Sequence, residues 1–357
     1  MDRNVLEDGF ARDAEAEWSD SAQPKVGVQI RLPAVVAHAD WGLAHAGRWV
    51  ARALLQADGS YRALGPEPAG VGPELAAWLL GEAQGGGVLL GVDFPIGVPA
   101  PFASRAGITN FLAWLQRGPP ESWYAAASTR EEIALQRPFY PRSRGGARRA
   151  HLVERLGVAG YRDLLRRCDR LTNATCMFWT MGPQQCGKVA IAGWRELARP
   201  VALDPGMGLW PFEGSLCSLL ATRQLVLAET YPAECYRQVL SLKGRFSKQR
   251  RDDRAACAPD MLRLAEGLAL APEGLGDAIR RGFYDADGAD NGFDAAVGLL
   301  AMLAVLRGCR GEGAPANPAA VRTVEGWMLG LDPAGPTGPA ATASGPPTRR
   351  AGAERGR

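Results

Sequence analysis

Three short apolar segments of the sequence each end in a carboxylate, and Gly or Pro follows each acid within three positions. The segments are residues 34–39, 88–92 and 224–228, and the acids that follow them are Asp40, Asp93 and Glu229. Parallel strands of an α/β sheet present their carboxyl ends at one edge, which is where such sheets bind ligands. We therefore expect these three side chains to face one another.

Three like charges at close range raise one another's pKa, so such a cluster makes sense only with a cation among its members. Carboxylate oxygens are hard ligands that select Mg²⁺ or Mn²⁺. Two such ions roughly 4 Å apart hold a phosphate group, activate a water molecule and stabilise the leaving oxygen. A single aspartate at a strand end is more often a turn former or helix cap, but its recurrence in three segments favours a metal site. The pattern thus predicts a divalent-metal-dependent phosphodiester hydrolase, most simply a nuclease.

A fourth carboxylate, Asp294, precedes an apolar stretch of twelve residues, 295–306, that contains no polar side chain. This stretch is predicted as a helix buried on every side and not as a membrane span. Two roles are open for Asp294. Asp294 shares a helix face with Gly298, which favours a role as a metal ligand. If Asn291 were the N-cap, Asp294 would instead lie in the first turn, where its negative charge interacts favourably with the helix dipole.

His38 precedes Asp40 by two residues and therefore shares its face of the predicted strand. A proton-transfer role and a satisfied core histidine both fit this position, and the core histidine is the more common case.

Basic residues supply candidates for phosphate or nucleic-acid contact, namely Lys188, Arg148, Arg149, Lys248 and Arg251. Solvated faces explain such residues in most proteins, and contact with a nucleic-acid backbone is the alternative. The segment 182–188 has the spacing of a phosphate-binding loop, but Val189 follows where Ser or Thr should bind magnesium, so a true loop of this kind is not expected.

The elements that must position these residues are those of a single α/β domain over residues 34–330. We expect strands at 34–39, 88–92 and 224–228, a hairpin of 48–55 and 60–64, and helices at 73–84, 256–269 and 295–306. The helical and loop-rich residues from about 101 to 222 are predicted as an insertion on the sheet. Residues 1–33 are polar and acidic and 331–357 are rich in Pro, Gly, Ala, Ser and Arg, so both are predicted as disordered tails.

The amino-acid composition limits the classes of protein to which this chain can belong. The 357 residues are 46% hydrophobic, enough for a substantial core, and a formal net charge of +3 leaves any nucleic-acid surface to local clustering. The seven cysteines form no C-x-x-C pair, which is typical of reduced thiols in a cytoplasmic protein. The acidic N-terminus lacks the apolar core of a signal peptide, so neither secretion nor membrane insertion is expected.

Five blocks resemble a known family in content, order and spacing. They are Ala-Asp-Trp-Gly at 39–42, Gly-Val-Asp-Phe-Pro-Ile-Gly at 91–97, Glu-Thr-Tyr-Pro-Ala-Glu at 229–234, Phe-Asp-Ala-Ala-Val-Gly-Leu-Leu at 293–300 and Glu-Gly-Trp-Met-Leu-Gly at 325–330. Over about residues 34–330 the chain resembles the domain of unknown function 429 family, described as predicted nucleases of the RNase H-like fold.

The resemblance implies an RNase H-like mixed sheet with an antiparallel hairpin after the first strand, flanking helices and a large insertion. It also implies that Asp40 takes the first-strand metal position, Asp93 and Glu229 the later strand positions, and Asp294 the helix position. A nucleic acid or nucleotide is then the expected substrate, with Mg²⁺ or Mn²⁺ as cofactor.

Two alternatives stay open. A phosphotransferase of the actin and sugar-kinase superfamily shares this fold and an Asp-x-Gly first strand, although one lobe without a second Asp-x-Gly hairpin argues against it. A non-catalytic nucleic-acid- or nucleotide-binding protein with the same fold is the other alternative. The absence of a G-x-S-x-G motif disfavours acyl-transfer chemistry. The choice among DNA, RNA and small nucleotides, and the oligomeric state, stay open as well.

Overall fold

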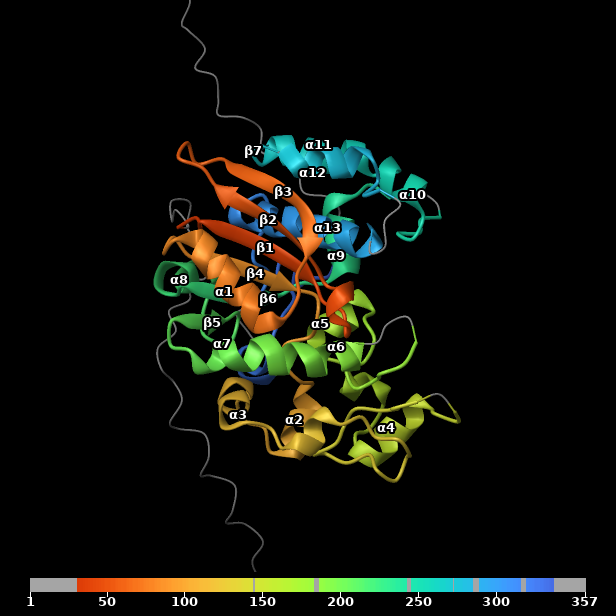
Figure 1. Ribbon diagram of the computed structural model, residues 1–357. Helices are drawn as coiled ribbons and strands as arrows, with labels where there is room; N and C mark the ends of the chain where they lie inside the picture. The colour runs from red at the N-terminus through yellow and green to blue at the C-terminus, as the bar shows by residue number, and fades with distance from the viewer. Residues whose placement is uncertain are drawn as a thin grey trace, which may run out of the picture.

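A seven-stranded mixed sheet organises the computed structural model (Figure 1), which describes residues 31–143, 145–182, 186–242, 245–271, 273–284, 289–315 and 319–336. The strand order is β5-β6-β4-β1-β2-β3-β7. The strands are β1 (Val35–Asp40), β2 (Trp49–Leu55), β3 (Tyr61–Pro68), β4 (Val88–Val92), β5 (Met207–Leu209), β6 (Leu225–Glu229) and β7 (Leu270–Ala271).

Among the seven described strands, β2 alone runs opposite to the others. β2 runs antiparallel to β1 and β3 antiparallel to β2, whereas β4, β6 and β5 follow parallel to β1, and β7 is parallel to β3. Every residue of β1, β4 and β6 is buried, because both faces of the central strands are covered by helices. The predicted mixed sheet with a hairpin after the first strand is therefore confirmed.

Helices cover both faces of the sheet (Figure 1). On one face, α13 (Ala289–Leu306) packs with α9 (Pro232–Val239), α11 (Ala258–Gly267) and α12 (Glu273–Arg280), beside α10 (Arg251–Ala256). On the other face lies α1 (Gly72–Ala83). Alternate residues of each central strand belong to the two apolar cores, such as Val36 to the α13 side and Ala37 to the α1 side.

The predicted insertion is built mainly of short helices, of which α2, α3 and α4 lie toward the lower end of Figure 1. They are α2 (Ala100–Ala106), α3 (Phe111–Arg117), α4 (Arg149–Leu156), α5 (Arg167–Thr172), α6 (Cys186–Gly193), α7 (Arg199–Leu203) and α8 (Leu216–Thr222). The same region also contributes β5, which pairs with β6 and extends the sheet. The insertion is therefore part of the sheet as well as a cover for it.

The helix α13 is the central helix of its core. It is long and apolar enough to cross a membrane, but 83% of that stretch is buried inside the protein, against the sheet and α9. A Cβ atom at Gly298 would stand 2.3 Å from the ring of His38, and one at Gly91 would stand 2.3 Å from Sδ of Met302. These two glycines thus allow the helix to lie directly on β1 and β4.

Two predicted boundaries are wrong. The helix expected at 295–306 begins at Ala289, because its first turns are also buried. Leu331, placed in the predicted C-terminal tail, is fully buried and its carbonyl oxygen accepts a hydrogen bond from Nε1 of Trp327 at 2.9 Å. The rest of the two predicted tails, residues 1–30 and 337–357, lies outside the described residues.

Candidate metal centre

Asp40 and Asp93 meet at the carboxyl edge of the sheet, as predicted. The registers pair Ala39 with Val92 across β1 and β4, so the acids that come next in each chain are neighbours. The charge of Asp93 raises the pKa of Asp40, which agrees with two carboxyl groups that lie close together. The Trp41 N–H donates to Oδ1 of Asp93 at 2.7 Å and ties the turn after β1 to this pair.

Asp294 reaches the same site from α13. It is the sixth residue of that helix, its side chain is 1% exposed, and it accepts hydrogen bonds from the Tyr236 hydroxyl and the Lys248 ammonium group. The interpretation of Asp294 as a first-turn residue behind an Asn291 cap is therefore wrong. The Asn291 side chain donates instead to the carbonyl oxygen of Gly47 at 2.9 Å.

Burial is the largest influence on all three carboxyl groups and raises their pKa values. The pKa of Asp93 rises to about 6. That of Asp40 rises well above its usual range, because the charges of Asp93 and Asp294 add to the effect of burial. Lys248 acts in the opposite direction on each of them. The negative charges of this cluster therefore repel one another, and the site is short of positive charge.

A divalent cation fits this set of donors. All three side chains offer hard oxygen ligands, and Mg²⁺ and Mn²⁺ prefer such ligands. The oxygens do not form one tight cage, since within the described residues only Cys168, Asp169 and Glu229 bring three ligand atoms within 4.8 Å of one another. Hydrogen bonds from Tyr236 and Lys248 fix the position of Asp294.

The structure places Glu229, the fourth expected carboxylate, apart from the other three. Along β6, Val226 and Ala228 pack on the α13 side and Leu225 and Leu227 on the opposite side. Side chains alternate along a strand, so Glu229 faces with Leu227, away from α13. The register aligns Glu229 with Val92, one position before Asp93. Thr230, and not Glu229, therefore occupies the row of Asp40 and Asp93.

Glu229 instead belongs to a buried ion pair with Arg166. Nη1 and Nη2 of Arg166 donate to its two oxygens at 2.6 Å each, and the Ile96 N–H donates to Oε2 at 2.7 Å. Asp169 receives two further hydrogen bonds from the same guanidinium group, at 2.8 and 3.0 Å. Burial raises the pKa of Glu229, and the Arg166 charge opposes that rise. This cluster joins the end of β6 to α5, and its carboxylates already have a cation.

His38 is a core residue next to the site. It is fully buried, and its Nε2 lies 2.7 Å from Oγ1 of Thr230. The Thr230 hydroxyl proton is directed to the carbonyl oxygen of Val92 at 3.0 Å, so the histidine must donate from Nε2. Burial lowers the pKa of His38 to about 4, which keeps the ring neutral. These contacts favour the core interpretation over a proton-transfer role.

Of the five basic residues predicted to contact phosphate, Lys248 lies at the carboxylates. Arg251 donates to the carbonyl oxygen of Arg281 at 3.1 Å, and the guanidinium group of Arg149 lies over the rings of Tyr161 and Trp179. Arg148 immediately precedes α4 and Lys188 lies in α6. Residues 183–185 of the loop-like segment before Lys188 lie outside the described part of the chain.

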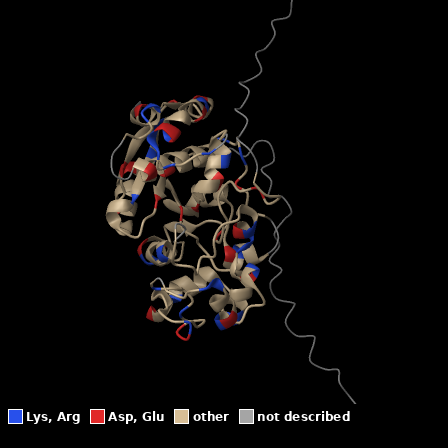
Figure 2. Cartoon of the chain, turned by 90° about the vertical axis from the view of Figure 1, so that its right-hand side faces the viewer, with Lys and Arg blue, Asp and Glu red and all other residues tan. Residues whose placement is uncertain are grey.

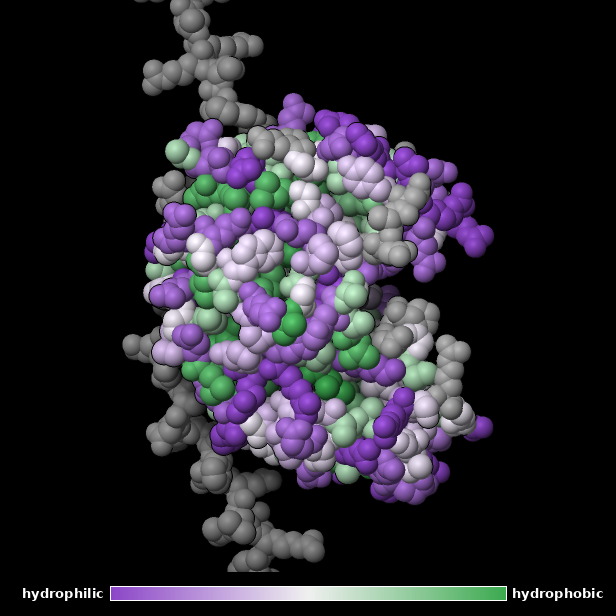
Figure 3. All heavy atoms as spheres, in the orientation of Figure 1, coloured by the Kyte–Doolittle hydropathy of each residue, from purple (hydrophilic) through white to green (hydrophobic). Residues whose placement is uncertain are grey.

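The carboxyl ends of β1 and its parallel neighbours lie on the right-hand side of Figure 1, toward α5, α6 and α9. Figure 2 faces this side and shows charged residues of both signs around it. The outline of Figure 3 is indented there, between α10 and the insertion. Basic residues are therefore interspersed with acidic ones on this side of the protein.

Two residues at this site were missed by sequence reasoning. Tyr236, from α9, orients Asp294 through its hydroxyl group, and Trp49 pairs directly with Asp40 across β1 and β2. The hairpin prediction contained a signal for Trp49, because the first residue of the second strand lies opposite the last residue of the first. Nothing in the sequence pattern around Tyr236 marked it, since the contact is made between two helices.

Comparisons with known protein families, curated proteins and solved structures find no match to this chain.

Proposed function

We propose that this chain is a Mg²⁺- or Mn²⁺-dependent hydrolase of phosphodiester bonds, a nuclease of the RNase H-like superfamily. The observation that carries the proposal is the convergence of Asp40, Asp93 and Asp294 in one buried site at the carboxyl edge of the sheet. The strand order β3-β2-β1-β4, antiparallel and then parallel, agrees with the fold that the family resemblance implies.

The chain's own residues would hold the ion and position it. Asp40 and Asp93 offer carboxylate oxygens at the ends of β1 and β4, and Asp294 adds a third carboxylate from α13. Tyr236 keeps Asp294 turned toward the site, and Lys248 balances part of the negative charge. A bound divalent ion would polarise the phosphate and lower the pKa of a water molecule. Glu229 is left out of the ligand set because Arg166 occupies both of its oxygens.

The proposal is tested by manganese binding and cleavage together. Calorimetric titration with Mn²⁺ is expected to show binding to the parent protein and weaker binding to Asp40→Asn. The matched control is Asp58→Asn, the same change at an exposed turn residue. Single-stranded, duplex and hybrid nucleic acids with Mn²⁺ then test for cleavage, which Asp40→Asn should abolish.

Three results would contradict the proposal. A parent protein that binds no Mn²⁺ would favour a binding protein without turnover. Nucleotide-dependent thermal stabilisation without cleavage would favour the phosphotransferase. A fully active Asp40→Asn variant would remove Asp40 from the mechanism.

A further inference from the structure

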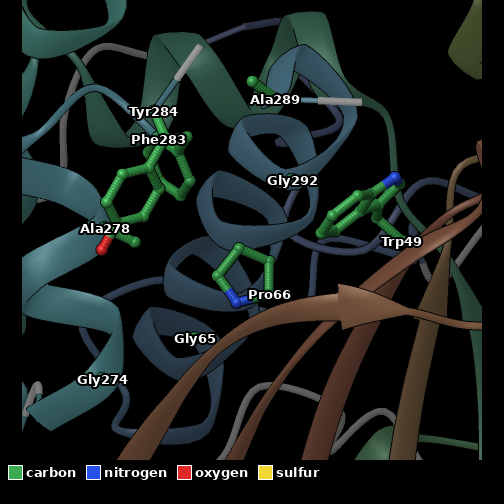
Figure 4. Close-up of a pocket in the computed structure, with 9 residues that line it drawn as sticks. All are labelled: Trp49, Gly65, Pro66, Gly274, Ala278, Phe283, Tyr284, Ala289 and Gly292. Carbon is green, nitrogen blue, oxygen red and sulfur yellow. The ribbon is translucent and has the colours of Figure 1, made fainter. Parts of the chain in front are cut away.

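An apolar cavity of about 220 Å³ lies between β3, α12 and the first turns of α13. Three of its nine lining residues are aromatic. Figure 4 shows the Trp49 indole on one side, the rings of Phe283 and Tyr284 on the other, and Pro66 between them. The hydroxyl group of Tyr284 donates to Oδ2 of Asp277 at 2.9 Å, so it is already satisfied by α12. The cavity therefore offers mainly flat apolar surfaces.

Glycines line this cavity and let its walls approach one another closely. Gly65, Gly274 and Gly292 all line it, and a Cβ atom at Gly292 would stand 3.3 Å from Cγ of Pro66 and 3.6 Å from Cε3 of Trp49. A side chain at position 292 would therefore project between the two walls. An apolar cavity of roughly 150 Å³ is sufficient to bind benzene. The larger volume here suits a planar ring system.

One wall of the cavity, Trp49, connects it to the carboxylate site. Trp49 lies directly opposite Asp40 in the antiparallel pairing of β1 and β2. Residues paired in this way project from the same face of a sheet, with their Cβ atoms about 5 Å apart. Gly292 and Asp294 both belong to the first two turns of α13 but point to different sides of the helix, so the link to the carboxylates is made through Trp49 and Asp40. A molecule whose charged group is held at the carboxylates would therefore have its neighbouring group beside the indole of Trp49.

We propose that this cavity binds the base of a nucleotide unit whose phosphate group lies at Asp40, Asp93 and Asp294. The inference rests on the proposed function and adds the class of substrate. Every base has a flat π face that stacks on aromatic side chains, so apolar walls of this kind tolerate any base. A base inside a cavity cannot remain stacked in a duplex. The substrate is then a single strand or a chain end.

The test compares two ligands that differ only in the base. Adenosine 5′-monophosphate and ribose 5-phosphate are titrated calorimetrically into the full chain with saturating Mn²⁺. The nucleotide is expected to bind about tenfold more tightly, which is the contribution of one stacked base. Gly292→Leu, which fills the cavity, should remove this difference while leaving Mn²⁺ affinity unchanged. The matched control is Gly81→Leu, because a Cβ atom at that helical glycine meets nothing within 4 Å.

A second variant guards against misfolding of Gly292→Leu. Tyr284 has a φ of +64°, a conformation that favours glycine, so Tyr284→Gly removes one wall and relieves the backbone. It should also reduce the preference for the nucleotide. Equal affinity for the two ligands in the parent protein, or a preference that survives both variants, would overturn the inference.

The two proposals fail in different ways. A parent protein that does not bind Mn²⁺ would contradict the proposed function. The cavity is then judged with adenosine against ribose in the absence of metal, where adenosine binding that Gly292→Leu abolishes supports it. If adenosine does not bind, the cavity has no role in base recognition.

Discussion

Replacing Glu229 by Gln separates a structural carboxylate from a metal ligand. In the folded protein this side chain is 3% exposed and accepts two hydrogen bonds from Arg166 and one from the Ile96 N–H. Glutamine keeps one acceptor oxygen for Ile96, but it directs an NH₂ group at a guanidinium group that can only donate. The variant therefore breaks a buried ion pair without changing the volume of the side chain.

The expected loss of stability depends on the hydrogen bonds that Arg166 retains in the variant. Removing one partner of a buried ion pair costs about 3–5 kcal/mol, because the other charge is left uncompensated. Arg166 retains its two hydrogen bonds to Asp169, so the loss should lie at the lower limit, about 3 kcal/mol. In a chain of this length, each kcal/mol lowers Tm by roughly 2 °C. A decrease in Tm of about 6 °C is the expected result.

The assay pairs thermal or urea unfolding with Mn²⁺ calorimetry. Glu229→Gln should unfold more easily and bind Mn²⁺ as the parent does. Asp40→Asn provides the opposite control, because removing a charge from a mutually repelling cluster should leave Tm unchanged or higher while Mn²⁺ affinity decreases. A Glu229→Gln protein of parental stability that binds Mn²⁺ weakly would show that Glu229 is a ligand and refute the assignment of Glu229 to the Arg166 pair.

Three further predictions concern packing, pH and the orientation of the site. Gly298→Ala should lower the free energy of unfolding in urea by about 1–3 kcal/mol, because its Cβ atom would clash with the ring of His38. Burial raises the pKa of Glu196, but hydrogen bonds from Arg48 and the Gly72 N–H outweigh it and leave the pKa below its usual 4.5. The Arg48 pair therefore contributes stability above pH 4.5 that is lost as the pH falls through the lowered pKa, and Glu196→Gln should lack this acid-dependent loss in unfolding curves. Tyr236→Phe should weaken Mn²⁺ binding about tenfold in calorimetry with little change in Tm, and unchanged affinity would deny the hydroxyl a positioning role.

The central strands could be predicted from the sequence to within one residue, because a strand buried on both faces must be apolar throughout. For the same reason, the sequence does not show on which face of the sheet the acidic residue at the end of each strand lies. Residues 225–228 are all apolar, so no alternation of polar and apolar residues shows which way Glu229 points. Its orientation depends on the register with β4, which is a tertiary property.

The start of α13 and the strand β5 were missed for other physical reasons. The segment Ala-Asp-Asn-Gly-Phe-Asp at 289–294 has the polar composition of a loop, but its glycine lies against Trp49 and Pro66, so packing extends the helix. β5 has only three residues, too few for a periodic pattern, and exists because β6 offers it an edge. Short elements of this kind are specified by their neighbours.

The chain of hydrogen bonds from His38 through the Thr230 hydroxyl to the carbonyl oxygen of Val92 has a consequence for cation binding. His38 belongs to β1, Thr230 directly follows β6, and Val92 ends β4. The two hydrogen bonds therefore link these three strands next to Asp40 and Asp93. Repelling carboxylates usually relax when the strands that carry them spread apart, and this link resists such spreading. The unfavourable electrostatic energy thus remains in the folded, metal-free state. If the proposed function is correct, a bound cation would relieve this repulsion without any prior movement of the strands. Such preorganisation would increase the affinity of the site for the cation.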